Sequence, residues 1–288
     1  MQNTEQTLTT MSRNPYQIDE EPSDIEFDAY EAHEGDRLFA STLARGMQIL
    51  RCFTPLEPAL GNKELARRTG LSPPTISRFT YTLVKLGYLR PDTLSGKYRL
   101  APGVVSLGYP LLASLTLRQL ARPLMNVLAE SMNCSVSMGI RDRLSIVYVE
   151  TSRITSAFAP QLSDIGLRFP IVSTAIGHAF ISGCEPAERQ KLLNEIRVKT
   201  PRMWTEHQDH AARSVAAFAK KGFCSVYGEQ HPDHYAVGVP MGRLRDGELI
   251  VFNAVIPRFR ASRQSVEEGL APRLMEMVAQ VRRSSYAV

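Results

Sequence analysis

Hydrophobic residues between residues 41 and 86 recur at helical spacing. The segment from Pro74 to Leu86 carries four of them at i, i+3, i+7 and i+10, which predicts a helix with one buried face. These residues are Ile76, Phe79, Leu83 and Leu86. A shorter helix is predicted at 63–69, and Gly70 can adopt the left-handed backbone that ends a helix. The pattern predicts two helices joined by a tight turn.

Polar residues mark the ends of these predicted helices. Asn62 is expected to cap the first and Ser72 the second, with Pro73 in the first turn, where its missing N–H costs nothing. An earlier helix is predicted at 42–53. Its cap is expected to be Ser41 and its buried stripe Leu43, Met47 and Leu50. Two short strands, 88–90 and 97–100, follow Gly87 and complete the pattern of a winged helix-turn-helix domain.

The rest of the chain combines helical stripes with β-branched runs. Helices are predicted at 102–112, 116–131, 174–182, 186–199, 210–221 and 264–283, the last with a kink near Pro272. Strands are predicted at 134–140, 145–150, 235–239 and 249–256. We therefore expect an α+β fold, in which helices flank a central antiparallel sheet. The expected divisions are a tail (1–38), the winged domain (39–100), a linker helix (101–118) and a second domain (119–288).

Two apolar surfaces in this pattern leave alternatives open. The linker helix has a broad apolar surface, which favours a partner helix, although it can also dock onto its own domain. Alternation over 134–140 places Val136, Met138 and Ile140 on one face of a strand. That face is either buried core or part of a ligand site.

The predicted winged domain carries an excess of positive charge. Residues 39–100 hold ten Lys and Arg against three acids, a difference of +7, which attracts a polyphosphate. Short hydroxyls and cations line the polar side of the second helix and suit base edges and phosphates. The candidate DNA contacts are Arg45, Ser72, Thr75, Ser77, Arg78, Thr82, Lys85 and Lys97. The alternative is a three-helix packing unit with a solvated basic face.

We assign these candidates to two kinds of contact. Thr75, Ser77 and Arg78 are expected at base edges, whereas Arg45, Lys85 and Lys97 are expected at phosphates. Residues 1–38 hold ten acids and two cations and lack periodicity, which predicts a disordered tail. This tail is either a passive extension or a competitor of DNA for the basic face.

Composition excludes several classes of protein. At 288 residues and 43% hydrophobic the chain can form two cores, and no apolar run approaches the roughly 20 residues of a membrane span. The acidic, polar N-terminus is no signal peptide, and the four cysteines form no CxxC pair. We expect a cytoplasmic protein with reduced thiols.

Motifs for catalysis or cofactors are missing from the sequence. There is no GxSxG elbow, GxxxxGK[ST] loop, HExxH or cysteine-based zinc pattern. Two HxxH pairs, His207 with His210 and His231 with His234, are interpreted as surface histidines in loops or at a helix start rather than as zinc ligands. No cofactor and no metal is expected.

Several sequence blocks resemble one family. "LARGMQIL" from Leu43, "LSPPTISRFTYTLVKLGYL" and "GKYRLAPGVVSLG" resemble the N-terminal domain of IclR-type bacterial transcription regulators. Residues 166–183, 222–240 and 249–260 resemble later blocks of the same family, so the resemblance runs from about Ser41 to the end. It implies a GAF-like effector-binding domain, a linker helix that pairs across a dimer, and a dimer or dimer of dimers.

The resemblance also implies where an effector binds. The chain departs from the family at Val226–Gly228, where acidic residues are usual, and at Asn253 and Val255, where small hydroxyl residues are usual. These departures favour an aromatic or apolar carboxylate, and a helix starting near Ser173 or Thr174 suits an anion. The candidates are Met138, Ser173, Thr174, Ala175, Ile176, Cys224, Tyr227, Glu229, Ala236, Asn253 and Val255. Each can instead be ordinary core, and Cys224 a small buried residue.

The favoured function is a sequence-specific DNA-binding regulator of transcription. A small organic acid in the C-terminal domain is expected to shift the population of DNA-binding states. Two alternatives remain from the residues alone. One is an enzyme of the C-terminal domain, and the other is a non-specific architectural DNA protein.

Overall fold

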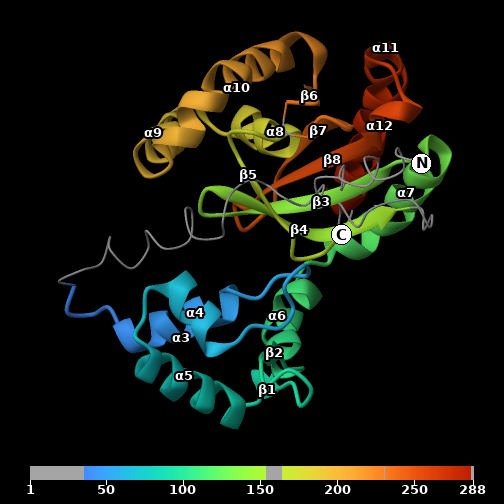
Figure 1. The fold of residues 1–288 in the computed structure, drawn as a ribbon. Helices are drawn as coiled ribbons and strands as arrows, with labels where there is room; N and C mark the ends of the chain where they lie inside the picture. The colour runs from blue at the N-terminus through green and yellow to red at the C-terminus, as the bar shows by residue number, and fades with distance from the viewer. Residues whose placement is uncertain (1–35, 154–163, 230, 287–288) are drawn as a thin grey trace, which may run out of the picture. The chain divides into compact units, whose positions relative to one another are not determined.

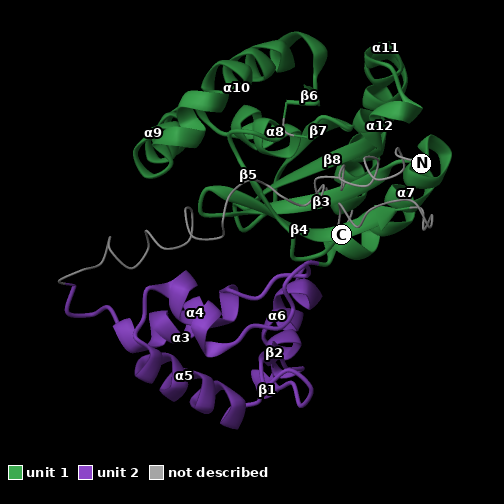
Figure 2. Cartoon of the chain, viewed as in Figure 1, with its two compact units in different colours: residues 1–19, 116–288 green, residues 20–115 purple. Residues whose placement is uncertain are grey.

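The computed structural model describes residues 36–153, 164–229 and 231–286. The chain divides into two compact units (Figure 2). The N-terminal one reaches to Leu115, is drawn in purple and is named the first unit; the other starts at Thr116, is drawn in green and is named the second unit. The expected acidic tail, residues 1–38, lies outside the described residues except for its last three positions.

In its described residues, the first unit combines a core of three helices and a hairpin with one further helix, α6 (Gly103–Ser114) (Figure 1). The three core helices are α3 (Ser41–Arg51), α4 (Asn62–Thr69) and α5 (Pro73–Lys85), and the hairpin strands are β1 (Leu89–Pro91) and β2 (Tyr98–Leu100). One buried cluster joins all three helices to the hairpin. Its members are Ile49, Cys52, Phe53, Leu60, Leu65, Ile76, Leu83 and Leu89.

The predicted turn is confirmed and the predicted cap at Asn62 is wrong, whereas Ser72 is the N-cap residue of α5 as predicted but makes no side-chain cap bond. Gly70 ends α4 with φ +66°, and Pro73 is the first residue of α5. Asn62 lies inside α4, and Glu64 does the capping, because its Oε2 accepts the Gly61 N–H at 2.6 Å. The hydroxyl of Ser72 contacts Thr75 Oγ1 at 2.9 Å instead of capping the backbone of α5.

The buried sides of two helices differ from the prediction. In α3 the buried residue is Ile49, whereas Leu43 is 67% exposed, and Ser41 is inside the helix rather than its cap. In α5 Leu86 is 61% exposed and Thr80 is buried, with its hydroxyl bonded to the Ile76 carbonyl. A hydroxyl that donates to a carbonyl of its own helix can be buried at little cost. A pattern of polar and apolar residues therefore does not predict that Thr80 is buried.

The wing is a small antiparallel hairpin. Leu89 pairs with Leu100 and Pro91 with Tyr98, and a bridge from Leu60 to Tyr98 adds a third short segment. Asp92 organises the tip, because its carboxylate accepts the Leu94 N–H, the Ser95 hydroxyl and Arg99 Nε.

Helix α6 (Gly103–Ser114) follows the wing and contains no buried residue. Its large apolar side chains are exposed, which confirms the predicted apolar surface. They are Val105, Leu107, Tyr109 and Leu111.

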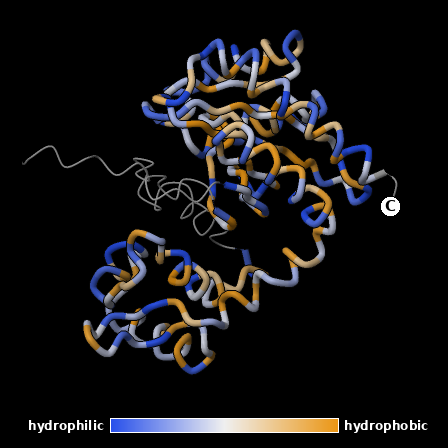
Figure 3. Tube along the Cα trace, turned by 90° about the vertical axis from the view of Figure 1, so that its right-hand side faces the viewer, coloured by the Kyte–Doolittle hydropathy of each residue, from blue (hydrophilic) through white to orange (hydrophobic). Residues whose placement is uncertain are grey.

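The second unit is a six-stranded antiparallel sheet with helices on both faces (Figure 1). The strand order is β5 (Arg168–Pro170), β4 (Ser145–Arg153), β3 (Ser135–Asp142), β8 (Leu249–Pro257), β7 (His234–Arg243), β6 (Cys224–Tyr227). Figure 3 shows hydrophobic colours along the strands and hydrophilic colours on the outer helical turns. The described residues thus form an α+β protein, as predicted.

Two sets of helices cover this sheet. Helices α7 (Leu117–Met132) and α12 (Ala271–Tyr286) pack on one face and contact each other. Helix α8 (Ala175–Gly183) packs on the other face, and α9 (Pro186–Lys199) and α10 (Pro201–Lys221) follow it in the chain. No helix in the described part of the chain has the length and apolar character that a membrane span requires.

Some elements differ from the prediction. The edge strands β5 and β6 were not predicted, and α10 begins at Pro201 rather than at residue 210. The last helix is interrupted as expected near Pro272, because a π-helical segment, η2 (Val266–Leu270), separates the short α11 (Arg263–Ser265) from α12.

Candidate nucleic-acid interface and ligand site

The outward side of α5 carries cations and hydroxyls. Arg78 and Lys85 are exposed, and so are Ser72, Ser77 and Thr82, whereas Thr75 is half-buried. The opposite side packs Ile76, Thr80 and Leu83 into the domain core. The predicted division into a polar and a buried face therefore holds for α5 as a whole.

The small hydroxyl groups of this face already have partners. Ser77 Oγ donates to the Pro73 carbonyl at 3.1 Å and accepts from Asn62 Nδ2 at 3.2 Å. Thr82 Oγ1 donates to the Arg78 carbonyl at 2.9 Å. A hydroxyl bonded to its own helix is a weaker candidate for a base edge than an exposed guanidinium.

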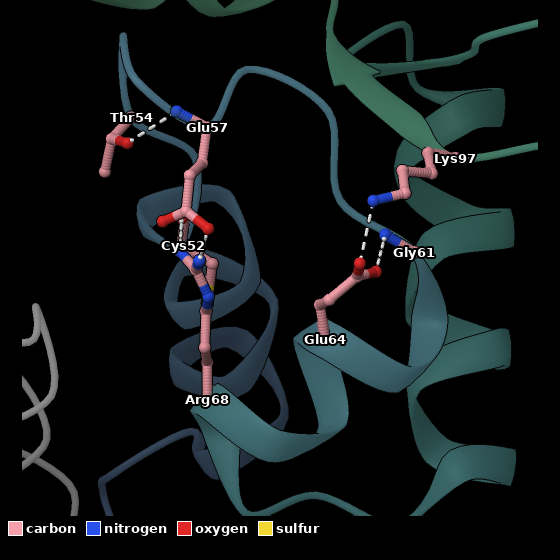
Figure 4. Close-up of polar contacts among 7 residues, drawn as sticks. All are labelled: Cys52, Thr54, Glu57, Gly61, Glu64, Arg68 and Lys97. Carbon is pink, nitrogen blue, oxygen red and sulfur yellow. Dashed lines mark hydrogen bonds and ion pairs between the residues drawn. The ribbon is translucent and has the colours of Figure 1, made fainter. Parts of the chain in front are cut away.

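All three acids of residues 39–100 pair with cations of the same segment. Arg68 lies 2.5 Å from Glu57, Lys97 lies 2.7 Å from Glu64, and Arg99 lies 3.1 Å from Asp92. Figure 4 shows the first two pairs, with Arg68 also donating to the Cys52 carbonyl. The outward charge is therefore carried by other cations, of which six are exposed. They are Arg51, Lys63, Arg67, Arg78, Lys85 and Arg90.

Two predicted phosphate contacts are less available than expected. Lys97 is held by Glu64, and the hydrogen bond from Lys97 keeps the pKa of the Glu64 carboxyl below its usual value. Arg45 is half-buried on α3. Arg78 and Lys85 remain the exposed cations among the predicted DNA contacts.

In the second unit, strand register places a buried polar group beneath α8. Asn253 pairs with Ser137 on one side and with Gly238 on the other, so all three lie on the same face. That face is covered by α8, since a Cβ on Gly238 would lie 2.1 Å from the Ala175 carbonyl oxygen. Asn253 Nδ2 donates to the Tyr148 hydroxyl at 2.7 Å.

This polar group has acceptor capacity that the protein does not use. Among the described residues, Asn253 Oδ1 is buried without a hydrogen-bond partner. Nearby on the same face, the Ser137 and Thr151 hydroxyls contact each other at 3.0 Å. A buried amide oxygen without a partner is costly, so a ligand that donates to it stabilises the site.

The start of α8 is built as predicted. Thr174 caps the helix, because its Oγ1 accepts the Gly177 N–H at 3.1 Å and donates to the Pro170 carbonyl at 2.8 Å. The candidate residues 173–176 are all buried. The positive end of the α8 dipole favours an anion at this point.

Two of the eleven effector candidates, Met138 and Tyr227, lie on the face of the sheet opposite to α8. Met138 pairs with Glu150 on the face that α7 covers, where Arg118 lies 3.1 Å from the Glu150 carboxylate. Tyr227 also faces away from α8, since its hydroxyl donates to Glu267 at 2.8 Å. The remaining candidates are in or near α8, on the sheet face beneath it, or, for Glu229, paired with His210 of α10.

Sequence reasoning missed residues on the α8 face. Tyr148 and His178 are fully buried there, and His178 Nε2 contacts the Val172 carbonyl at 2.8 Å. Burial lowers the pKa of His178 to about 4. Alternation within residues 145–150 could have placed Tyr148 on one face, but nothing local linked it to Asn253.

Two other features lie apart from these candidates. A hollow of about 420 Å³ between the end of α7 and η2 is lined by Met132, Arg260 and Val266 but by none of the effector candidates. His207 and His210 share a face of α10, which corrects the predicted loop or helix start. The described residues contain no cluster of three or more His, Cys, Asp or Glu side chains that suits a metal.

Comparisons with known proteins match both units. The IclR helix-turn-helix domain matches residues 42–93, and the bacterial transcriptional regulator IclR C-terminal domain matches residues 110–283. The transcriptional regulator TsaQ1/TsaQ2 of Comamonas testosteroni is 32% identical over 241 residues, 83% of this chain and 86% of the relative.

Solved structures agree with this assignment. An IclR family transcriptional regulator from Brucella abortus is 40% identical with a TM-score of 0.74, covering 86% of this chain and 94% of the other. An IclR homologue from Microbacterium hydrocarbonoxydans, solved in complex with 4-hydroxybenzoate, shares the fold with a TM-score of 0.67 at 21% identity. It covers 86% of this chain and 100% of the other. The chain belongs to the IclR family of transcriptional regulators, which are DNA-binding regulators and not enzymes.

Proposed function

We propose that this regulator binds a specific operator through α5 and that a small organic acid, preferably aromatic, controls the binding from the α8 face. The observation that carries the effector part is the buried Asn253 Oδ1, which has no partner among the described residues. A ligand donor can satisfy this oxygen while its carboxylate lies towards the start of α8.

The DNA-binding part is supported by the first unit. The exposed cations of α5 lie on the side opposite its buried face, so a duplex can approach them without unfolding the domain. We infer that two copies act together, with recognition helices about one turn of DNA, roughly 34 Å, apart. The exposed apolar residues of α6 supply a surface for the second copy.

The aromatic preference is supported by the surroundings of Asn253. The Tyr148 ring lies 4.4 Å from Phe169 between centroids, and Ala236 and Val255 pair beside Asn253 on the same face. Such surroundings suit an apolar ligand body with few polar groups. The complex of the Microbacterium hydrocarbonoxydans homologue with 4-hydroxybenzoate agrees with this class of ligand.

The test combines DNA binding with ligand binding. Fluorescence anisotropy with the DNA upstream of the coding region, in the presence of benzoate, 4-hydroxybenzoate or pyruvate, should give a selective complex that an aromatic acid changes. Asn253→Ala should abolish the response to the acid and leave DNA binding intact, whereas the exposed control Asn126→Ala should keep both. Equal affinity for unrelated duplexes and no response to any acid would instead indicate the architectural alternative.

A further inference from the structure

Tyr81 lies on the outward side of α5. Its residue type alone did not mark it as a candidate DNA contact. At about 100° per residue, its side chain points about 140° away from Ile76, about 160° away from Leu83 and about 100° away from Thr80, the three buried residues of the helix. Its side chain is 66% exposed. Tyr81 therefore projects away from the domain core.

The neighbours of Tyr81 are the exposed cations of the same helix. Arg78 is three residues before it and Lys85 four residues after it, so both are adjacent on the helix surface. Lys85 Nζ lies 5.5 Å from the centroid of the Tyr81 ring. Cations on both sides bring phosphates close to the ring.

The Tyr81 hydroxyl is still available as a hydrogen-bond donor, unlike the hydroxyls of the smaller residues on this helix. Ser77 and Thr82 donate to carbonyls of their own helix. Within the described residues, the Tyr81 hydroxyl makes no hydrogen bond, and most of the side chain is exposed. It can therefore offer an apolar surface and a donor to the same binding partner.

We propose that Tyr81 contacts the operator and determines part of its sequence preference. This inference rests on the proposed operator binding through α5. The ring packs against a thymine C5-methyl group in the major groove, and the hydroxyl donates to a phosphate oxygen or a base acceptor nearby. An apolar contact of this kind distinguishes thymine from the other bases.

The experiment uses the full chain and a duplex selected from a random pool by the wild-type protein. Tyr81→Ala should weaken binding to this duplex about tenfold or more, while affinity for a scrambled duplex changes by less than about threefold. Tyr81→Phe should have an intermediate affinity, which separates the hydroxyl from the ring. Leu86→Ala is the matched control, because Leu86, the residue directly after α5, is 61% exposed but points about 140° away from Tyr81.

Thymine-to-uracil substitution tests the methyl contact directly. Uracil at one position of each half-site should weaken the wild-type complex and leave the Tyr81→Ala complex unchanged, because the contact is already lost. If the wild type binds selectively and Tyr81→Ala has the same affinity and the same response to uracil, the inference about Tyr81 is overturned. The proposed function would then still stand. A wild-type chain that selects no sequence would overturn the proposed function as well.

Discussion

At the scale of single residues, Glu64 connects two parts of the helix-turn-helix domain. One carboxylate oxygen accepts the Gly61 N–H at the start of α4, and the other lies 2.7 Å from Lys97 Nζ on the wing. Glu64 therefore stabilises the start of α4 and, by pairing with Lys97, makes this lysine less available to a DNA phosphate. Exposed ion pairs of this kind contribute little to stability. The effect of the pair on DNA affinity is therefore more informative to measure than its effect on the free energy of unfolding.

Glu64→Gln should increase operator affinity severalfold, because Lys97 is then available to a phosphate. The logarithm of affinity should also fall more steeply with the logarithm of salt concentration, by about one unit of slope. Glu57→Gln removes the same charge, but its partner Arg68 stays bonded to the Cys52 carbonyl. If both variants gain equally, net charge rather than Lys97 explains the effect.

His178 makes stability depend on pH. Burial lowers the pKa of His178 from 6.5 to about 4, so between these values the unfolded chain binds a proton that the native protein does not. The contribution of His178 to stability should therefore fall as pH decreases from about 6.5 to 4, by about 3 kcal/mol. His178→Gln should lose less stability between pH 7 and pH 5 in urea unfolding. An equal loss in both proteins would contradict this assignment.

The sequence predicted those site residues whose signals are local. Gly70 and Thr174 are examples, since a left-handed turn and a helix cap depend on a few neighbouring residues. The bond between Asn253 and Tyr148 was not predictable, because it joins strands more than a hundred positions apart and depends on register. Tyr81 was missed because exposure, unlike residue type, requires the fold.

At the scale of elements, a buried charge cluster attaches α7 to the sheet. The Glu150 side chain on β4 is 3% exposed and lies 3.1 Å from Arg118 and 2.7 Å from Arg122. Arg118 is 13% exposed and Arg122 is 55% exposed. Breaking a buried pair leaves a charge without compensation, whereas losing an exposed partner costs much less.

The three variants of this cluster should differ in stability. Arg118→Ala should lower the free energy of unfolding by about 3 kcal/mol, because it leaves the buried Glu150 carboxylate poorly compensated. Arg122→Ala should cost about 1 kcal/mol or less. Urea unfolding measures both values, and equal losses would show that burial does not separate the two arginines.

Element prediction succeeded where apolar periodicity was long. Helix α9 has the predicted bounds, and strands β3 and β8 deviate by one or two residues at their ends. The edge strands β5 and β6 have three and four residues and exist only through pairing with β4 and β7. Strands of three or four residues are too short to show an alternation of apolar and polar residues. The first turns of α10 were not predicted, because the residues after Pro201 are mostly polar.

At the scale of the whole molecule, α6 provides an apolar surface near the C-terminal end of the first unit. None of its residues is buried, and Val105, Leu107 and Tyr109 are more than half exposed. Contiguous exposed apolar surfaces often mark interaction sites in soluble proteins. The sequence predicted this surface, but a single chain does not reveal its partner.

Leu107→Asp should weaken self-association of the chain, because it places a charge in the proposed helix pair. Light scattering after size exclusion should then give a lower mass for this variant than for the wild type. The control Ser106→Asp changes a neighbouring exposed position of the same helix. A wild-type protein that is monomeric at micromolar concentration would rule out α6 as a strong dimer contact.

If the outward side of α5 recognises an operator, the exposed Arg78 should be one of the side chains on which recognition depends. The measurement is an anisotropy titration of wild type and Arg78→Ala against the selected duplex and a scrambled duplex at the same salt concentration. We expect Arg78→Ala to lose about tenfold or more on the selected duplex and much less on the scrambled one. Equal affinity of both proteins for the selected duplex would show that Arg78 on the outward side of α5 does not recognise the operator.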